Sequence, residues 1–216
     1  MKYDEINDLS PKRNLEKLVR KGQKIMGEIK LLMNLYLVRH AHSVYTPDEM
    51  GRPLSERGFK DSKVVTELLK KEKIDYVFAS PYKRAIQTVE GIATYINKEI
   101  KIVDTFKERV LAGKPVKDFT AAITKVWQDE NFAWQGGESN KTAQKRATDS
   151  LFQVLDKYKG KNLVIGTHGN IMVLMMNYFD NRYGSEFWKR LEMPDVYKLS
   201  FEDNKLLEIK RIWKTY

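Results

Sequence analysis

Short apolar runs alternate with amphipathic stretches from residue 34 onward, a pattern typical of alternating strands and helices. The apolar runs are too short for core helices of ordinary length, so they predict buried strands. The predicted strands are residues 34–39, 74–80, 100–107 and 163–167. The predicted helices are residues 53–71, 80–96, 119–127 and 139–158, and one more from about Asn170.

Two further apolar stretches, residues 197–202 and 206–213, flank Asp203-Asn204 and predict a C-terminal hairpin. Strands that alternate with helices predict a three-layer α/β/α sandwich around a mixed, mostly parallel sheet. The chain contains no repeat and no Pro/Ser-rich linker, and its one candidate boundary lies at residues 32–34. We therefore expect a helical extension over residues 1–32 and one domain over residues 33–216.

The N-terminal segment begins a helix at Ser10-Pro11, with serine as the N-cap and proline at the first helical position. Apolar residues follow at helical spacing, but Gly22 interrupts their stripe. Basic residues such as Lys17 and Arg20 would suit a helix that docks on a partner or a membrane. The interrupted stripe favours the alternative, a helix that packs on its own domain or a poorly ordered extension.

Composition narrows the chemistry, because the 216 residues include no cysteine and only three histidines. Disulfides, thiolate zinc sites, iron–sulfur clusters and cysteine nucleophiles are excluded. No signal peptide or long apolar span is present, so we expect a cytoplasmic protein without a membrane partner. The net charge of +10 suits an anionic ligand, but its basic residues are spread along the chain without a nucleic-acid motif, so no nucleic-acid partner is expected.

Polar side chains follow four predicted strands, at the edge where open α/β sheets bind their ligands. Arg39 and His40 follow the first strand, Arg84 lies one helical turn after the second, Glu108 follows the third and His168 the fourth. Each residue alone could be a surface charge or a satisfied core histidine. Those separate explanations do not account for the placement of all five residues after strands.

Together these five side chains suit phosphoryl transfer. Two arginines match phosphate oxygens, a neutral imidazole can attack phosphorus, and a carboxylic acid can protonate the leaving alkoxide. A second imidazole can stabilise the transition state, and no metal or other cofactor is required. His40 and His42 could instead form half of a metal site, but only His168, Asp48 and Glu49 are available as further ligands.

Five sequence blocks, in order, resemble those of the histidine phosphatase superfamily, also called the phosphoglycerate mutase-like family. The blocks are Leu37-Val38-Arg39-His40-Ala41-His42-Ser43, Leu54-Ser55-Glu56-Arg57-Gly58, Ser80-Pro81-Tyr82-Lys83-Arg84-Ala85-Ile86-Gln87-Thr88, Gly136-Gly137-Glu138-Ser139 and Thr167-His168-Gly169-Asn170. The resemblance implies that His40 becomes phosphorylated and that Arg39, Arg84 and His168 bind the phosphoryl group. It implies that Glu108 is the proton donor and then the base.

The resemblance also implies four substrate-binding positions, which are His42, Ser43, Thr46 and Gly169. His42 would lie at the pocket mouth, Thr46 replaces an asparagine that contacts phosphate in many members, and Gly169 would offer backbone close to the phosphate. Ala41 departs from the family's usual glycine, which should be tolerated unless this position requires a positive φ.

Phosphatase is favoured over mutase because the insertion that mutases carry is absent. Only 28 positions separate Glu108 from Gly136, and no tyrosine closely follows the glutamate. The expected substrate is a small phosphorylated metabolite, and a homodimer is one option for assembly. The alternatives are a cofactor-dependent phosphoglycerate mutase and a phospho-ligand binding protein with weak catalysis.

An aromatic segment precedes the Gly-Glu-Ser loop and contains Trp127, Phe132 and Trp134. These rings could form a lid and line an apolar pocket for the body of the substrate. Alternatively, they pack the segment onto the domain.

Overall fold

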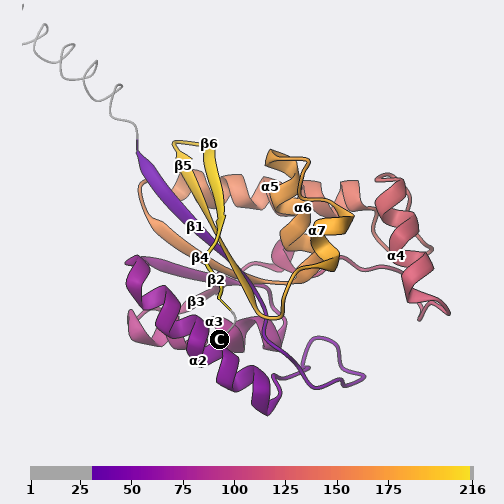
Figure 1. Cartoon of the computed structure of the whole chain (residues 1–216), viewed down its shortest axis with the longest axis horizontal. Helices are drawn as coiled ribbons and strands as arrows, with labels where there is room; N and C mark the ends of the chain where they lie inside the picture. Colours follow the sequence, from indigo (N-terminus) through magenta and orange to yellow (C-terminus); the bar gives the residue numbers. More distant parts are fainter. Residues whose placement is uncertain (1–30, 215–216) are drawn as a thin grey trace, which may run out of the picture. The chain divides into compact units, whose positions relative to one another are not determined.

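A six-stranded sheet forms the centre of the molecule, in the order β3-β2-β4-β1-β5-β6 (Figure 1). The computed structural model describes residues 31–214, so the expected N-terminal helix lies outside the described residues. The strands are β1 (Leu32–Arg39), β2 (Tyr76–Ala79), β3 (Ile100–Ile102), β4 (Asn162–Thr167), β5 (Asp195–Glu202) and β6 (Lys205–Arg211). Strands β1 to β4 pair in parallel, whereas β5 is antiparallel to both β1 and β6, so the sheet is mixed.

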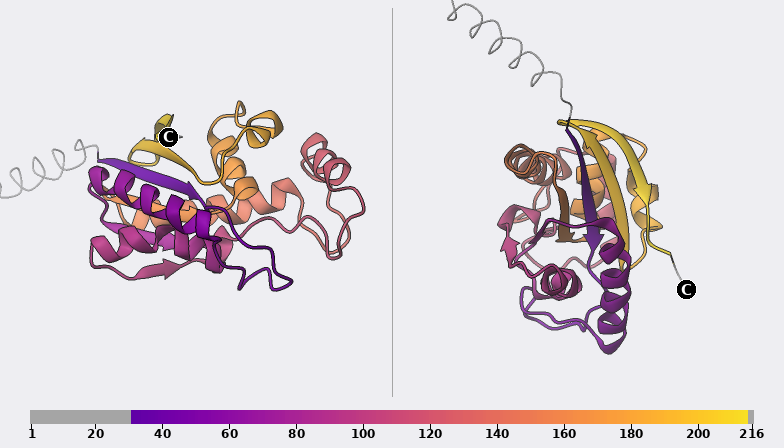
Figure 2. Two further views of the ribbon diagram at one scale, coloured as in Figure 1. Left: turned by 60° about the horizontal axis from the view of Figure 1, so that its bottom comes forward. Right: turned by 90° about the vertical axis from the view of Figure 1, so that its left-hand side faces the viewer.

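Helices cover both faces of the sheet, as the two views of Figure 2 show. The α-helices are α2 (Glu56–Leu69), α3 (Lys83–Tyr95), α4 (Phe119–Gln128), α5 (Asn140–Lys157), α6 (Gly169–Phe179) and α7 (Ser185–Lys189). Helices α2 and α3 pack on one face, and α5 and α6 pack on the other. The three-layer α/β/α sandwich predicted from the sequence is therefore confirmed.

The central strand β1 shows why its sequence is a nearly continuous apolar run. Tyr36 and Val38 face the layer of α2 and α3, whereas Leu35 and Leu37 face the layer of α5 and α6. All four residues are fully buried, because a sheet covered on both faces has no solvated side. The first polar side chain after this run is Arg39, at the carboxyl end of the strand.

The third strand is shorter than predicted. β3 spans Ile100–Ile102 instead of residues 100–107, and the 3-10 turn η2 (Asp104–Phe106) follows it. β3 is an edge strand that pairs with β2 alone, and β2 itself has four residues, so the ladder ends at Ile102. The chain then turns and buries Phe106 in the core, and Glu108 reaches the N-terminus of α6 (Gly169–Phe179).

The start of the second helix also differs from the prediction. α3 begins at Lys83 with Tyr82 as its N-cap, and no side chain caps it. Ser80 does not cap this helix, because its hydroxyl bonds the ring of His168. Ser55 and Ser139 do cap α2 and α5, since their side chains accept from the Gly58 and Thr142 backbone N–H groups. Helix α7 was not predicted.

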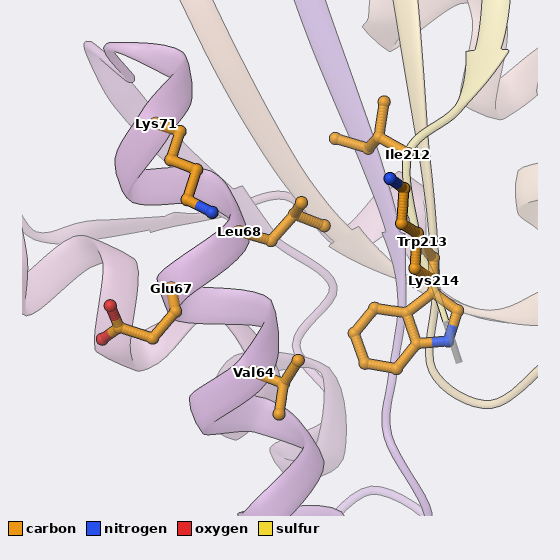
Figure 3. Close-up of a pocket in the computed structure, with 7 residues that line it drawn as sticks. All are labelled: Val64, Glu67, Leu68, Lys71, Ile212, Trp213 and Lys214. Carbon is orange, nitrogen blue, oxygen red and sulfur yellow. The ribbon is translucent and has the colours of Figure 1, made fainter. Parts of the chain in front are cut away.

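A small groove lies on the face of the sandwich that carries α2 (Figure 3). It has a volume of about 160 Å³, and its walls are α2 and the segment that follows β6. Leu68 and Trp213 form its apolar floor, whereas Lys71 and Lys214 lie at its rim. None of the predicted site residues lines this groove. Among the described residues, no helix has the length and apolarity to cross a membrane.

Candidate active site

The two predicted site histidines lie side by side because of the register of β1 and β4. Arg39 pairs with Thr167 at the ends of these neighbouring parallel strands, and the His40 N–H donates to the Thr167 carbonyl at 2.9 Å. The rings of His40 and His168 meet edge to face with centroids 5.2 Å apart. Sequence positions far apart in the chain are thus adjacent at the carboxyl edge of the sheet.

His40 is buried, with 5% of its surface exposed, and its ring has a defined orientation. Its Nδ1 lies 2.8 Å from the Ala41 carbonyl oxygen, which can only accept, so Nδ1 carries the proton and Nε2 has the lone pair. Arg84 Nε donates to that Nε2 at 3.2 Å. Burial, with Arg84 and Arg39 nearby, lowers the pKa of His40 to about 3, so the imidazole is neutral at pH 7.

His168 is even more deeply buried, and Ser80 holds its ring. Ser80 Oγ lies 2.8 Å from His168 Nε2 and also accepts from the Tyr82 N–H. The Nδ1 atom of His168 has no hydrogen-bond partner in the described part of the chain. Burial, and then the neighbouring His40 and Arg84, lowers the pKa of His168 well below the usual value. The sequence indicated Ser80 only as the start of a helix and as part of the third block, and did not indicate its contact with His168.

Arg39 lies against the start of α6, where Gly169 allows a close approach. A Cβ atom on Gly169 would lie only 3.1 Å from the guanidinium carbon of Arg39, so a larger residue would displace the arginine. Arg39 Nη1 donates to the carbonyl oxygens of Leu191 at 2.7 Å and Glu192 at 3.1 Å. Its Nε is buried without a partner within residues 31–214, which leaves a donor for a ligand.

Arg84 is almost completely buried, with 2% of its surface exposed. Besides its bond to His40, it donates from Nη1 to the Glu49 backbone carbonyl at 2.8 Å and from Nη2 to Glu49 Oε1 at 2.9 Å. The Tyr82 ring lies 4.8 Å from the guanidinium carbon. Sequence reasoning considered Glu49 only as a metal ligand and did not expect it on the phosphate-binding arginine.

Glu108 lies at the N-terminus of α6, beside the two histidines. Its Oε1 accepts from the backbone N–H groups of Arg109 and Ile171, and its Oε2 accepts from that of Asn170, at 2.8–3.0 Å. The positive end of the helix dipole favours a carboxylate at this position. The structure thus brings Arg39, His40, Arg84, Glu108 and His168 together at one edge of the sheet.

Arg146 of α5 braces the segment that carries Glu108. Its guanidinium binds both carboxylate oxygens of Glu138, at 2.6 and 2.8 Å, and donates to the carbonyls of Thr105, Lys107 and Glu108. The pKa of Glu138 is lowered: burial raises it, but the hydrogen bonds and charge of Arg146 outweigh that effect. Glu138 belongs to the Gly-Glu-Ser block, so this block supports the segment that carries Glu108; nothing in the sequence indicated Arg146.

Three predicted substrate-binding residues lie in the segment after β1 and have other partners. The Nδ1 of His42 is 2.8 Å from the hydroxyl of Ser55, the N-cap of α2. Thr46 Oγ1 donates to the Asp48 carbonyl, and Ser43 forms an isolated bridge with Leu54. Within residues 31–214, no hydrogen bond joins His42, Ser43 or Thr46 to the five clustered residues.

Ala41 needs no glycine-like backbone. The non-glycine residues with positive φ in the described chain are Lys73, Asn97 and Asp203, so alanine at position 41 is unstrained. Its N–H donates to Thr88 Oγ1, which in turn donates to the Arg84 carbonyl. This chain of bonds links the first and third sequence blocks.

The aromatic segment divides into two parts. Trp127 packs against the hydrophobic core, as the packing interpretation predicts. Phe132 and Trp134 meet edge to face and help to line an apolar cleft of about 630 Å³ beside α4. None of the five clustered residues lines this cleft. In Figure 2, α4 and residues 43–53 both lie beyond the end of the sheet toward which β1 points.

The cluster offers few metal ligands. No group of three or more histidine or carboxylate side chains within residues 31–214 is arranged to hold a metal ion. The charges that face His40 Nε2 are instead guanidinium groups, which suit an anion.

Comparison with known proteins agrees with this geometry. Residues 35–212 match the model of the histidine phosphatase superfamily (branch 1). The chain is 30% identical to phosphoserine phosphatase 1 of Hydrogenobacter thermophilus over 156 residues, which is 63% of this chain and 71% of that protein. It is 26% identical to phosphoglycerate mutase-like protein 4 of Arabidopsis thaliana over 158 residues, 64% of this chain and 67% of that protein.

A solved structure shares the fold at lower identity. A mycobacterial glucosyl-3-phosphoglycerate phosphatase superposes with a TM-score of 0.68 at 16% identity, covering 84% of this chain and 97% of that one. The matched range runs from β1 to the residue after β6 and contains all five clustered residues. The chain belongs to the histidine phosphatase superfamily.

Proposed function

We propose that this protein is a phosphatase that hydrolyses phosphate monoesters through a covalent phosphohistidine on His40. The observation that carries this proposal is the orientation of His40. The imidazole of His40 is buried and neutral at pH 7. Its Nε2 bears a lone pair and faces the guanidinium of Arg84. A neutral imidazole beside fixed cations is the arrangement that nucleophilic attack on a phosphoryl group requires.

In the first step, His40 Nε2 forms a bond to phosphorus while the bond from phosphorus to the ester oxygen breaks. Arg84 Nε, which now occupies the Nε2 lone pair, donates to a phosphoryl oxygen instead. The unpartnered Nε of Arg39 and Nδ1 of His168 are further donors for the equatorial oxygens. His168 can supply an Nδ1 proton when Ser80 donates its hydroxyl proton to Nε2.

Glu108 provides the proton that the leaving alkoxide takes up. Oε1 accepts two backbone N–H groups but Oε2 accepts only one, so Oε2 keeps a lone pair for the proton. In the second step the ionised Glu108 takes a proton from water, whose oxygen attacks phosphorus. The phosphorus–Nε2 bond breaks, and phosphate and protonated Glu108 result.

The guanidinium and imidazole groups supply the charge that a metal supplies in other phosphoryl transfers. We therefore expect hydrolysis to continue in a chelator and to be inhibited by vanadate, which resembles the pentacoordinate transition state. The substrate we propose is a small phosphorylated metabolite in the cytoplasm. The relatives named for phosphoserine and glucosyl-3-phosphoglycerate support a small polar substrate body.

A phosphatase is favoured over a mutase because the segment between Glu108 and Gly136 contains only one helix, α4. The test is a phosphate-release screen over metabolite monoesters, with His40→Ala as control. Free phosphate from wild type, without dependence on a bisphosphoglycerate, supports the phosphatase. Interconversion of phosphoglycerates without release of phosphate would contradict it.

A further inference from the structure

The phosphate-binding arginine already binds a carboxylate of its own chain. Arg84 Nη2 lies 2.9 Å from Glu49 Oε1, and Arg84 Nη1 lies 2.8 Å from the Glu49 backbone carbonyl. Nη1 and Nη2 are the two ends of the guanidinium group, and their N–H donors match the spacing of two phosphoryl oxygens. The Glu49 carboxylate occupies the Nη2 donor, so a phosphoryl group that binds Nη2 competes with this carboxylate for it.

Only one member of this ion pair is free to move. The Arg84 side chain is 2% exposed and is fixed by His40 and by the Tyr82 ring. The Glu49 side chain is 52% exposed, so water can solvate its carboxylate when it leaves the arginine. A phosphoryl group would displace Glu49 and leave Arg84 in place.

A second arginine can keep Glu49 after such a displacement. Arg52 Nη1 lies 3.0 Å from Glu49 Oε2, so the carboxylate bridges two guanidinium groups through different oxygens. The arrangement also keeps the buried charge of Arg84 compensated when no ligand is bound, which matters because an unpaired buried charge is costly.

We propose that Glu49 is an internal competitor for the phosphoryl site, which holds Arg84 in the empty pocket and moves onto Arg52 alone when a phosphoryl group binds. This inference rests on the proposed function, because that function makes Arg84 a phosphate ligand. The apparent affinity for phosphate is the intrinsic affinity multiplied by the fraction of molecules in which Glu49 has left Arg84. Glu49 thus weakens binding of both substrate and product phosphate.

The test is the dissociation constant of inorganic phosphate, measured by calorimetry on the full chain. Glu49→Gln removes the charge at constant shape, and we expect about tenfold tighter binding if Glu49 occupies Arg84 about nine-tenths of the time. Glu49→Asp keeps the charge but withdraws the carboxylate by one methylene, so tighter binding is expected here too. The matched control is Asp48→Asn, because the Asp48 carboxylate bonds Gly51 and does not contact Arg84.

Each outcome is decisive. Unchanged or weaker phosphate binding in Glu49→Gln would overturn the proposal. Tighter binding in Glu49→Gln and Asp48→Asn but not in Glu49→Asp would also overturn it, because it would show a general effect of local charge. Phosphate binding needs no turnover, so this test can be separated from the test of the proposed function. A wild-type protein that binds phosphate but hydrolyses no monoester would contradict the proposed phosphatase activity. The phosphate affinities of the variants would still test the role of Glu49.

Discussion

Arg84 Nε donates a hydrogen bond to His40 Nε2 at 3.2 Å. The lone pair that accepts this bond is the one that attacks phosphorus in the proposed mechanism. In the proposed mechanism, Arg84 therefore both binds the phosphoryl group and holds the nucleophile in place until a substrate arrives. Substrate binding exchanges this hydrogen bond for one to a phosphoryl oxygen and exposes the lone pair to phosphorus. Arrival of the phosphate and release of the nucleophile are thus one event.

Replacement of this arginine tests that relationship. Arg84→Lys keeps a positive charge but loses the planar fork and the Nε–H that faces His40. We expect kcat/KM to fall by about 10²–10³, the usual loss when a donor to the transition state is removed. Arg57→Lys, an exposed arginine of α2 outside the cluster, is the control. Equal activity of the two variants would contradict the assigned role of Arg84.

The proton donor is tested by Glu108→Gln. Glutamine can still accept the Arg109 and Ile171 N–H groups through Oε1, but it has no acidic proton to transfer. We expect kcat to fall by about 10²–10⁴. The loss should be smaller for aryl phosphates, whose leaving groups need little protonation. A uniform loss of kcat/KM, which reports the step that releases the alcohol, over aryl and alkyl esters in a phosphate-release assay would show that Glu108 does not act on the leaving group.

Arg146 is expected to act through Glu108, as a positioning residue. Arg146→Lys cannot bind both oxygens of Glu138 and three carbonyls, so Glu108 should shift and kcat should fall by about tenfold or more at similar KM. In the Glu108→Gln background the same change should have little further effect. Lys145→Gln, at the neighbouring exposed position, is the control. Additive losses in the double variant would contradict the coupling.

Burial of His40 makes stability depend on pH. Its pKa is about 3 in the folded protein and near 6.5 when exposed, so between these values only the unfolded chain takes up the proton. Acid therefore favours unfolding. Relative to His40→Ala, the wild-type free energy of unfolding should fall by about 1.4 kcal/mol per pH unit from pH 6 to pH 4. The free energies of unfolding are measured by denaturant titration at each pH. If wild type and His40→Ala show the same dependence on pH, His40 is not buried in its neutral form.

Much of the fold was predictable because apolar runs and caps are local signals. Ser55 and Ser139 cap α2 and α5 with their side chains, and the strands of the sheet follow the apolar runs. The length of β3 was not predictable, because it depends on its neighbour β2. A strand at the edge of a sheet ends where its partner ends, whatever its own sequence favours.

The candidate site was predictable in its five central residues, because parallel strands end at one edge, although Glu108 follows the turn η2 and not the end of β3. Its supporting residues were not. Glu49 and Arg146 contact partners distant in the sequence, and neither residue follows a strand end that would mark it. The place of His42 at the pocket mouth stays a prediction, whereas the contact of its ring with Ser55 at the start of α2 was not indicated by the sequence.

The covalent phosphohistidine on His40 is the central claim, and mass spectrometry of the intact protein tests it most directly. Wild-type protein and His40→Ala are mixed with a reactive aryl phosphate and quenched in alkali, in which phosphohistidine is stable. We predict that wild type gains the mass of one phosphoryl group, that acid removes it, and that His40→Ala gains nothing and releases no phosphate. Phosphate release by His40→Ala at the wild-type rate, or a phosphoryl group on another residue, would contradict the account.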